Sequence, residues 1–220
     1  SEFNKINYNS LTNLLSTLSI ENKIPKKIIF ASTISVYGEK YNKRMYLEDS
    51  NLEPLSPYAR TKLKAEQYLT ENFHENSWLL RFAPVYSDDF LLNIYRRTKI
   101  FNYFYKIGNG NNKLSLCNLR NIIFVINEIL NEKIPPGIYN LSDLNPYTYR
   151  ELIDYQNPNI VFRINRIFLQ VLYYFGKIFG VLSIRENCIK LLTDNIYSSE
   201  KIHQFSDLPF DLNTLKINNN

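Results

Sequence analysis

The chain has 220 residues, of which 45% are hydrophobic and 21% charged, a composition typical of a folded globular protein. Its formal charge of +5 comes from Lys and Arg scattered along the sequence, and without a long basic run no nucleic-acid partner is predicted. The mild excess of cations suits an anionic small molecule instead.

Cysteine and histidine spacing gives no sign of a metal site. Cys117 and Cys188 lie far apart and have no ligand-type spacing with His74 or His203. We therefore expect no metal and no disulfide framework, but two reduced, buried thiols in a cytoplasmic protein. The chain begins with Ser and shows no basic-then-apolar leader, so we also expect a fragment that lacks its natural start.

The first part of the chain predicts a parallel α/β sheet. We expect, in chain order, a helix at 8–18, a buried apolar strand at 27–32, a long polar loop at 39–57, a helix at 57–72 and a strand at 78–82. This order is typical of a parallel sheet with right-handed crossovers.

The second part is predicted to be more mixed. We expect a helix at 90–104, a Gly-Asn turn at 107–112, a strand at 113–117, a helix at 121–130, a strand at 138–141 and then a small helical region. These elements predict two regions and a tail. Residues 1–86 would be the C-terminal part of a Rossmann-type domain, 87–215 a smaller α/β substrate-binding region with some segments returning to the sheet, and 216–220 a tail.

Residues 167–184 form the most apolar stretch and are almost long enough to span a bilayer. Gln170, Gly176, Lys177 and Gly180 interrupt it, and a charge near the centre of a membrane helix is costly. We expect an amphipathic helix packed on the rest of the fold and no integral membrane segment, with peripheral membrane contact as the alternative.

One pair of residues is a candidate for acid–base catalysis. Tyr58 and Lys62 lie four residues apart on the predicted helix at 57–72, so both side chains share one face. A nearby ammonium favours the phenolate and lowers a tyrosine pKa from about 10, which would make Tyr58 a usable base. Alone, the same spacing also arises by chance on solvated helices.

The surroundings of this pair resemble a known family. The segment FASTISVYG ends the predicted strand at 27–32, and SPYARTKLKAE follows at 56–66. Together they resemble the extended short-chain dehydrogenases/reductases, in the branch of the nucleotide-sugar epimerases and dehydratases. The resemblance runs from about Asn7 to the region of 191–202. It implies a partial Rossmann-type parallel sheet with helices, and a smaller C-terminal α/β region.

The resemblance also assigns roles to five residues. Thr33 would hydrogen-bond a sugar oxygen, Tyr58 would be the general base, and Lys62 would hold the nicotinamide ribose. Ser32 and Ala83 would be further contacts of the cofactor. The implied cofactor is NAD rather than NADP, and the implied substrate is a nucleotide-diphosphate sugar.

The implied reaction is oxidation of a sugar hydroxyl to a keto-sugar, followed by return of the hydride to the other face, as in a UDP-glucose 4-epimerase. In the dehydratases of this family an Asp and a Glu follow the strand-end Thr. Ile34 and Ser35 stand there in this chain and cannot transfer that proton, which argues against dehydration. Reduction or oxidation of a keto-sugar nucleotide, and a non-catalytic sugar-nucleotide-binding relative, remain open.

Other positions resemble the family less closely. Asn7 matches a helix asparagine that supports the active-site helix, although an exposed polar residue would fit equally. Pro84 stands where many members have a substrate-binding Asn, and Lys113 where an Arg meets the diphosphate. The family's usual His and Asp pair is replaced by the polar residues Asn118, Arg120 and Asn121.

None of the six glycines forms the glycine-rich turn that binds the pyrophosphate of a dinucleotide. The resemblance places this motif upstream of the chain, and the truncated sheet would then have an open apolar edge. We expect the 220 residues alone to fold poorly or not to hold NAD. By analogy with the family, we also expect a homodimer built from the helices near residues 8 and 57.

Overall fold

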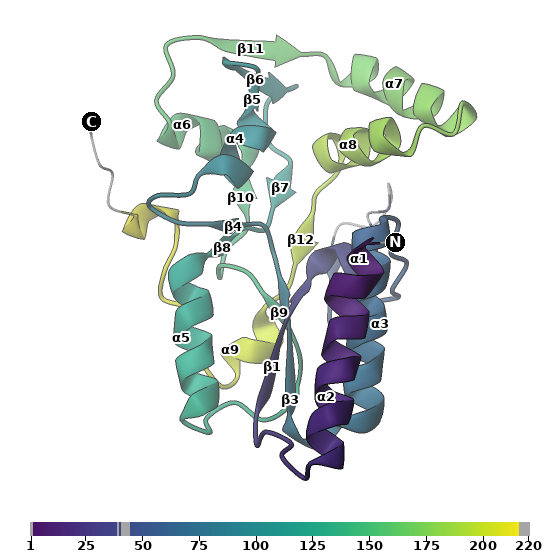
Figure 1. Ribbon diagram of the computed structural model, residues 1–220. Coiled ribbons are helices and arrows are strands. Elements are labelled where there is room, and N and C mark those ends of the chain that lie inside the picture. The colour runs from purple at the N-terminus through teal and green to yellow at the C-terminus, as the bar shows by residue number, and fades with distance from the viewer. Residues whose placement is uncertain (1, 39, 41–44, 216–220) are drawn as a thin grey trace.

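The computed structural model describes residues 2–38, 40 and 45–215, and the expected tail lies outside them. Figure 1 shows two parts: a parallel sheet between helices below, and a smaller group of strands and helices above. The α/β class that the sequence predicts, with a Rossmann-type parallel sheet, is confirmed.

The main sheet has the strand order β1-β3-β9, and all its strands are parallel. The strands are β1 (Ile28–Thr33), β3 (Ser77–Phe82) and β9 (Gly137–Leu141). Helices α2 (Ser10–Ile20) and α3 (Pro57–Asn72) cover one face, while α5 (Leu119–Leu130) and α9 (Glu200–His203) lie on the other (Figure 1). Because β9 pairs with β3, a segment from the second part of the chain lies in this sheet.

Both faces of β3 are buried, as expected for a central parallel strand. Trp78 and Leu80 pack with α5 and α9, whereas Leu79 faces the opposite way into a cluster with Leu15 and Leu69 of α2 and α3. Because successive side chains of a strand point to opposite faces, the apolar residues of β3 contribute to two cores, one on each face of the sheet.

Helix α3 occupies the predicted residues because both ends carry local signals. The Ser56 hydroxyl accepts a hydrogen bond from the Ala59 backbone N–H at 3.2 Å, and Pro57 stands at the first helical position. Ahead of α2, the chain forms α1 (Glu2–Asn4) and the π-helical turn η1 (Lys5–Asn9).

The upper part contains a three-stranded sheet and four helices. The strands are β5 (Lys99–Ile100), β6 (Tyr103–Ile107) and β11 (Val161–Ile164), and the helices are α4 (Leu92–Thr98), α6 (Tyr149–Tyr155), α7 (Arg166–Ile178) and α8 (Leu182–Leu192). Short strand pairs link the two parts: β2 (Met45–Tyr46) with β12 (Ile196–Tyr197), β4 (Val85–Tyr86) with β8 (Cys117–Asn118), and β7 (Lys113–Leu114) with β10 (Tyr147–Thr148). The remaining turns are η2 (Ile34–Tyr37), η3 (His74–Asn76) and η4 (Leu212–Thr214).

Three sequence expectations about this part are wrong. The expected helix at 90–104 ends at Thr98, and a hairpin of β5 and β6 follows because Tyr105 and Ile107 alternate into the core and β6 pairs with β11. The expected strand at 113–117 is split into β7 and β8, which pair with different partners. The expected helical region after residue 141 also contains β10, β11 and β12.

The apolar stretch at 167–184 forms a helical hairpin of α7 and α8 that turns at Gly180, where φ is 69°. Gly176 lies against α8, and a Cβ there would come within 3.1 Å of the Ile184 side chain. Close packing of the two helices thus depends on a glycine. In the part of the chain that the structure describes, no helix is both long and apolar enough to cross a membrane.

Candidate functional site

Thr33 is the last residue of β1 and lies at the carboxyl end of the parallel sheet. Its hydroxyl accepts a hydrogen bond from the Ser35 backbone N–H at 3.2 Å and donates to the Ser35 hydroxyl at 3.2 Å. The turn η2 that starts here fixes the Thr33 side chain at the end of the strand where ligands bind in open α/β sheets.

Tyr58 and Lys62 reach the same end of β1 from α3. The Lys62 ammonium donates a hydrogen bond to the Ala31 carbonyl at 3.0 Å and lies 5.9 Å from the centre of the Tyr58 ring. Thr33 and Tyr58 both line one cavity of about 1050 Å³, whereas Lys62 is not among the described residues that line it. Strand β1 and helix α3 therefore bring the three residues together.

The pKa of Tyr58 differs from the sequence expectation. Burial raises the pKa of Tyr58, and burial also lowers the pKa of Lys62, an effect that Glu66 partly offsets. The expected lowering of the tyrosine pKa is not found, because burial raises it instead. At neutral pH the Tyr58 hydroxyl of this structure is protonated and can donate a proton.

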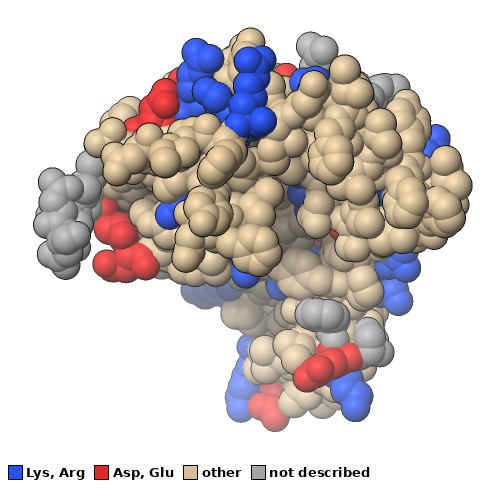
Figure 2. Space-filling model, turned by 90° about the horizontal axis from the view of Figure 1, so that it is seen from above, with Lys and Arg blue, Asp and Glu red and all other residues tan. Residues whose placement is uncertain are grey.

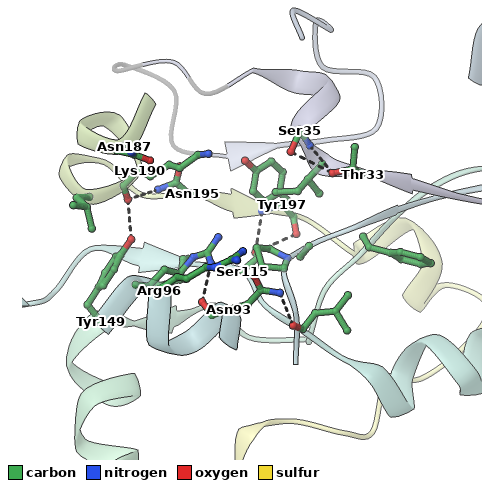
Figure 3. Close-up of a pocket in the computed structure, with 18 of the residues that line it drawn as sticks. Thr33, Ser35, Asn93, Arg96, Ser115, Tyr149, Asn187, Lys190, Asn195 and Tyr197 are labelled. Atoms are coloured by element: carbon green, nitrogen blue, oxygen red, sulfur yellow. Dashed lines mark hydrogen bonds between the residues drawn. The ribbon is translucent and has the colours of Figure 1, made fainter. Parts of the chain in front are cut away.

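The cavity extends from Thr33 to the upper part of the molecule (Figure 3). Helix α4 supplies Arg96 and Arg97, Lys99 follows α4, and α8 supplies Lys190. No acidic side chain lines the cavity among the described residues. Neutral polar groups in the lining are Asn93, Ser115, Asn187 and Asn195. The wall opposite Thr33 is therefore cationic and suits an anionic ligand.

Several of these side chains are held by defined contacts. Arg97 donates to the Asn93 carbonyl at 2.8 Å, and Lys99 lies over the Tyr95 and Phe104 rings at 4.1 and 4.4 Å from their centres. Arg96 is exposed and makes no hydrogen bond or ion pair with the other described residues, so its guanidinium donors are available to a ligand.

The structure places the other expected site residues as follows. Ser32, Ala83 and Pro84 line the cavity. Lys113 is exposed and does not line it, although the next two residues of the chain do. Asn7 donates to the Thr61 hydroxyl at 3.3 Å, which joins η1 to α3.

The sequence did not predict that cations of α4 and α8 line the cavity. The pair at 96–97 is visible in the sequence, but the expectation of a long helix concealed its position in the last turn of a short helix beside the cavity. Lys190 comes from a segment whose folding partners lie far away in the chain. Only the tertiary contacts bring these positions to the strand ends.

A buried polar network lies beneath Thr33 and Tyr58. Arg81 of β3, 1% exposed, donates from Nε to Glu66 Oε1 at 3.1 Å and from Nη2 to Oε2 at 2.7 Å. The Ser32 hydroxyl donates to the same carboxylate. Arg81 also donates to the Tyr37 hydroxyl at 2.8 Å, and burial raises the pKa of Tyr37 to about 12. The network ties β1, β3 and α3 together under the site.

The positions that depart from the family pattern have structural contacts. The Asn118 backbone N–H donates to Asp143 Oδ1 at 2.7 Å, and Asn121 Nδ2 donates to the same oxygen at 3.0 Å. The Asn118 side chain accepts from the Arg120 backbone N–H at 3.0 Å and so caps α5. None of these three residues lines the cavity, so these departures leave its wall intact.

The residues present fit the nicotinamide end of NAD. The Lys62 ammonium uses one of its three donors on the Ala31 carbonyl, which leaves donors for the hydroxyls of a ribose beside Tyr58. Ser32 and Ala83 lie at the ends of β1 and β3, beside Thr33. The glycine-rich turn for the pyrophosphate is absent from the 220 residues, so this chain alone fits one half of the dinucleotide.

Comparisons with known proteins agree with this geometry. The family model for GDP-mannose 4,6 dehydratase matches residues 1–168. A stretch of 61 residues is 46% identical to an uncharacterized UDP-glucose epimerase, YtcB, of Bacillus subtilis strain 168, and covers 26% of this chain and 19% of that protein.

Two solved structures share the fold. A UDP-glucuronic acid 4-epimerase from Bacillus cereus, in complex with NAD, has a TM-score of 0.65 at 20% identity over 94% of this chain and 62% of its own. A dTDP-glucose 4,6-dehydratase from Bacillus anthracis strain Ames, also with NAD, has a TM-score of 0.64 at 15% identity over 95% of this chain and 64% of its own. This chain therefore spans less than two thirds of either protein.

Proposed function

We propose a function for this chain on the premise that it belongs to the GDP-mannose 4,6-dehydratase family, within the extended short-chain dehydrogenases/reductases. The proposed activity is NAD-dependent epimerisation of a nucleotide-diphosphate sugar through a keto-sugar. One observation carries the proposal: Thr33 and Tyr58 share a cavity with four cationic side chains and, among the described residues, no acidic one.

In the proposed reaction, Tyr58 accepts or returns the proton of a sugar hydroxyl. The Thr33 O–H turns away from Ser35 and donates a hydrogen bond to the same sugar oxygen. When bound, NAD⁺ would accept the hydride of the sugar carbon and later return it to the opposite face. In the oxidation half Tyr58 acts as the base, and in the reduction half it returns the proton to the keto oxygen. Lys62 would orient the ribose of the bound cofactor beside Tyr58.

Epimerisation is favoured over dehydration by the residues after Thr33. Elimination of water needs a proton acceptor and donor beside the sugar. Ile34 is buried, and Ser35 is engaged by Thr33, so neither replaces a carboxylic acid. No Asp or Glu from the described segments lines the cavity to replace them.

Reduction of a keto-sugar nucleotide is the second candidate. The raised pKa of Tyr58 favours the protonated phenol, which is the form that donates a proton to a keto oxygen. This activity would consume NADH or NADPH, whereas an epimerase regenerates its cofactor. A non-catalytic relative would show neither activity.

We assign the diphosphate of the substrate to Arg96, Lys99 and Lys190. Arg96 can bind two phosphate oxygens at once, while the two lysines contribute as point charges. Arg96 of α4 and Lys190 of α8 lie across the cavity from Thr33 (Figure 3). Lys99, the residue after α4, lines the same cavity. Arg97 contributes charge, although it is engaged by the Asn93 carbonyl.

The assembly and location of the protein are also part of the proposal. Exposed apolar residues near α2, Ile6 and Leu14, support a homodimer built on α2 and α3. The free, buried Cys117 and Cys188 support a cytoplasmic protein.

The test uses the full-length protein. Nucleotide sugars are incubated with NAD, and inversion at the sugar carbon is followed by NMR while NADH is followed by absorbance. We expect inversion without net NADH, and loss of turnover in Tyr58→Phe. The control Tyr68→Phe alters a tyrosine of the same helix outside the cavity and should leave turnover intact. Unchanged turnover in Tyr58→Phe would refute the role of Tyr58.

A further inference from the structure

Helix α7 carries an exposed apolar stripe that the fold does not use. Its members recur every three or four residues and therefore lie along one side of the helix. They are Ile167, Phe168, Val171, Tyr174, Phe175 and Ile178, and each is between 47% and 78% exposed. A surface helix normally presents polar residues to water on this side.

The other side of α7 already forms a core. Leu169 is buried with Cys188 and Leu192 of α8, and Gly176 touches Ile184. The exposed stripe is therefore not needed to hold the hairpin together. Phe179, 66% exposed at the turn between the helices, extends it.

A second apolar group lies at the same end of the molecule. Strand β11 is joined to α7 through Asn165, and Phe162 of β11 contacts Tyr103 of β6 edge-on at 5.7 Å between ring centres. The β5–β6 turn presents Phe101, which is 93% exposed and held at φ 54°. Figure 1 shows β5, β6 and β11 beside α7 at the top of the molecule.

The charges around this surface are mainly positive, with Glu186 of α8 as the acidic residue of the hairpin. Between Asp154 and Glu186 the sequence has no acidic residue, but it has Arg163, Arg166, Lys177 and Arg185. None of these four cations pairs with a carboxylate in the described parts of the chain. Seen from above, this end shows mainly uncharged residues, with Lys and Arg and some Asp and Glu toward its borders (Figure 2). An apolar stripe bordered by unpaired cations is complementary to an anionic, partly apolar surface.

We propose that the α7–α8 hairpin docks this protein on the surface of a membrane that contains anionic lipids. The stripe of α7 would lie in the plane of the interface, with its aromatic rings at the level of the headgroups, and the cations would contact lipid phosphates. With 13 residues, α7 is about 20 Å long, shorter than the hydrocarbon core, so it lies on the membrane. A second copy of the chain fits less well, because a symmetric contact would bring the same cations together.

The docking would place the cavity near the lipid surface. Asn187 and Lys190 of α8 line the cavity, while α7 covers the outer side of α8. The hairpin thus has one side in the proposed substrate site and the other on the membrane.

The experiment measures co-sedimentation of the full-length protein with vesicles. One set contains phosphatidylcholine alone, and the other contains equal parts of phosphatidylcholine and phosphatidylserine. We expect binding to the anionic vesicles, weakened by salt, and a loss of about tenfold in affinity for Ile178→Gln. Lys177→Glu should weaken binding to anionic vesicles and change little with neutral ones.

The matched control is Ile20→Gln, since Ile20 is 83% exposed at the end of α2, away from the hairpin. Its binding should equal that of the unchanged protein. Absence of binding to anionic vesicles would overturn the proposal, as would equal binding of Ile178→Gln. A lipid-independent dimer that becomes monomeric in Ile178→Gln would instead identify the surface as a contact between copies.

Discussion

Replacement of Glu66 by Gln should destabilise the protein more than most single changes on α3. Glu66 and Arg81 are an ion pair in which the side chains are 3% and 1% exposed. The substitution keeps the shape of Glu66 but removes its charge, so the Arg81 guanidinium is left buried without a counter-charge. Removing one partner of a buried ion pair costs about 3–5 kcal/mol.

Four contacts point to the upper part of that range. Arg81 donates three hydrogen bonds to the two carboxylate oxygens at 2.7 to 3.2 Å, and Ser32 donates to one of these oxygens. A Gln amide has one acceptor oxygen, so its NH₂ group would face a donor. Because the network joins β1, β3 and α3, we expect Thr33 and Tyr58 to lose their alignment as well.

The assay is urea unfolding followed by circular dichroism, with Glu71→Gln as the control. Glu71 is exposed on the same helix, and surface changes are usually within about 0.5 kcal/mol. A loss below about 1 kcal/mol in Glu66→Gln would refute the reasoning that the buried Arg81 depends on this carboxylate.

Three further predictions concern activity and packing. Because burial raises the pKa of Tyr58, its phenolate forms only at higher pH. The rate of sugar oxidation should therefore rise from about pH 7 to about pH 9 in a pH–rate profile. A flat profile would exclude Tyr58 as the base. Arg96→Ala should raise KM for the nucleotide sugar about tenfold and leave kcat nearly unchanged; an unchanged KM would remove Arg96 from the diphosphate site. Gly176→Leu should push α7 away from α8 and lower the free energy of unfolding by about 2 kcal/mol in a urea titration. An unchanged midpoint of urea unfolding would show that the two helices can separate without loss of stability.

Local signals explain what could be predicted from the sequence. The bounds of α3 are readable because Ser56 caps it and Pro57 opens it, and β1 and β3 are readable because parallel strands are apolar on both faces. The motif around Thr33 and Tyr58 then identified the family, which the comparisons confirm.

Features that depend on distant partners could not be read in this way. The β5–β6 hairpin needs β11, about 60 residues later, to form its sheet. The charge pattern of the cavity depends on α8, and the Glu66–Arg81 pair joins residues that look like an ordinary exposed Glu and a strand-end Arg in the sequence. Secondary-structure propensity describes each segment by itself, whereas these contacts form only when distant segments come together in the folded chain.

The central claim is that Tyr58 and Thr33 support hydride-based inversion of a nucleotide sugar. The most direct measurement is the reaction of the full-length protein in D₂O with NAD, followed by NMR of the inverted carbon. The account predicts inversion in which the carbon-bound hydrogen is retained, because it leaves and returns as hydride. Deuterium at that carbon, or inversion that persists in Tyr58→Phe, would contradict it.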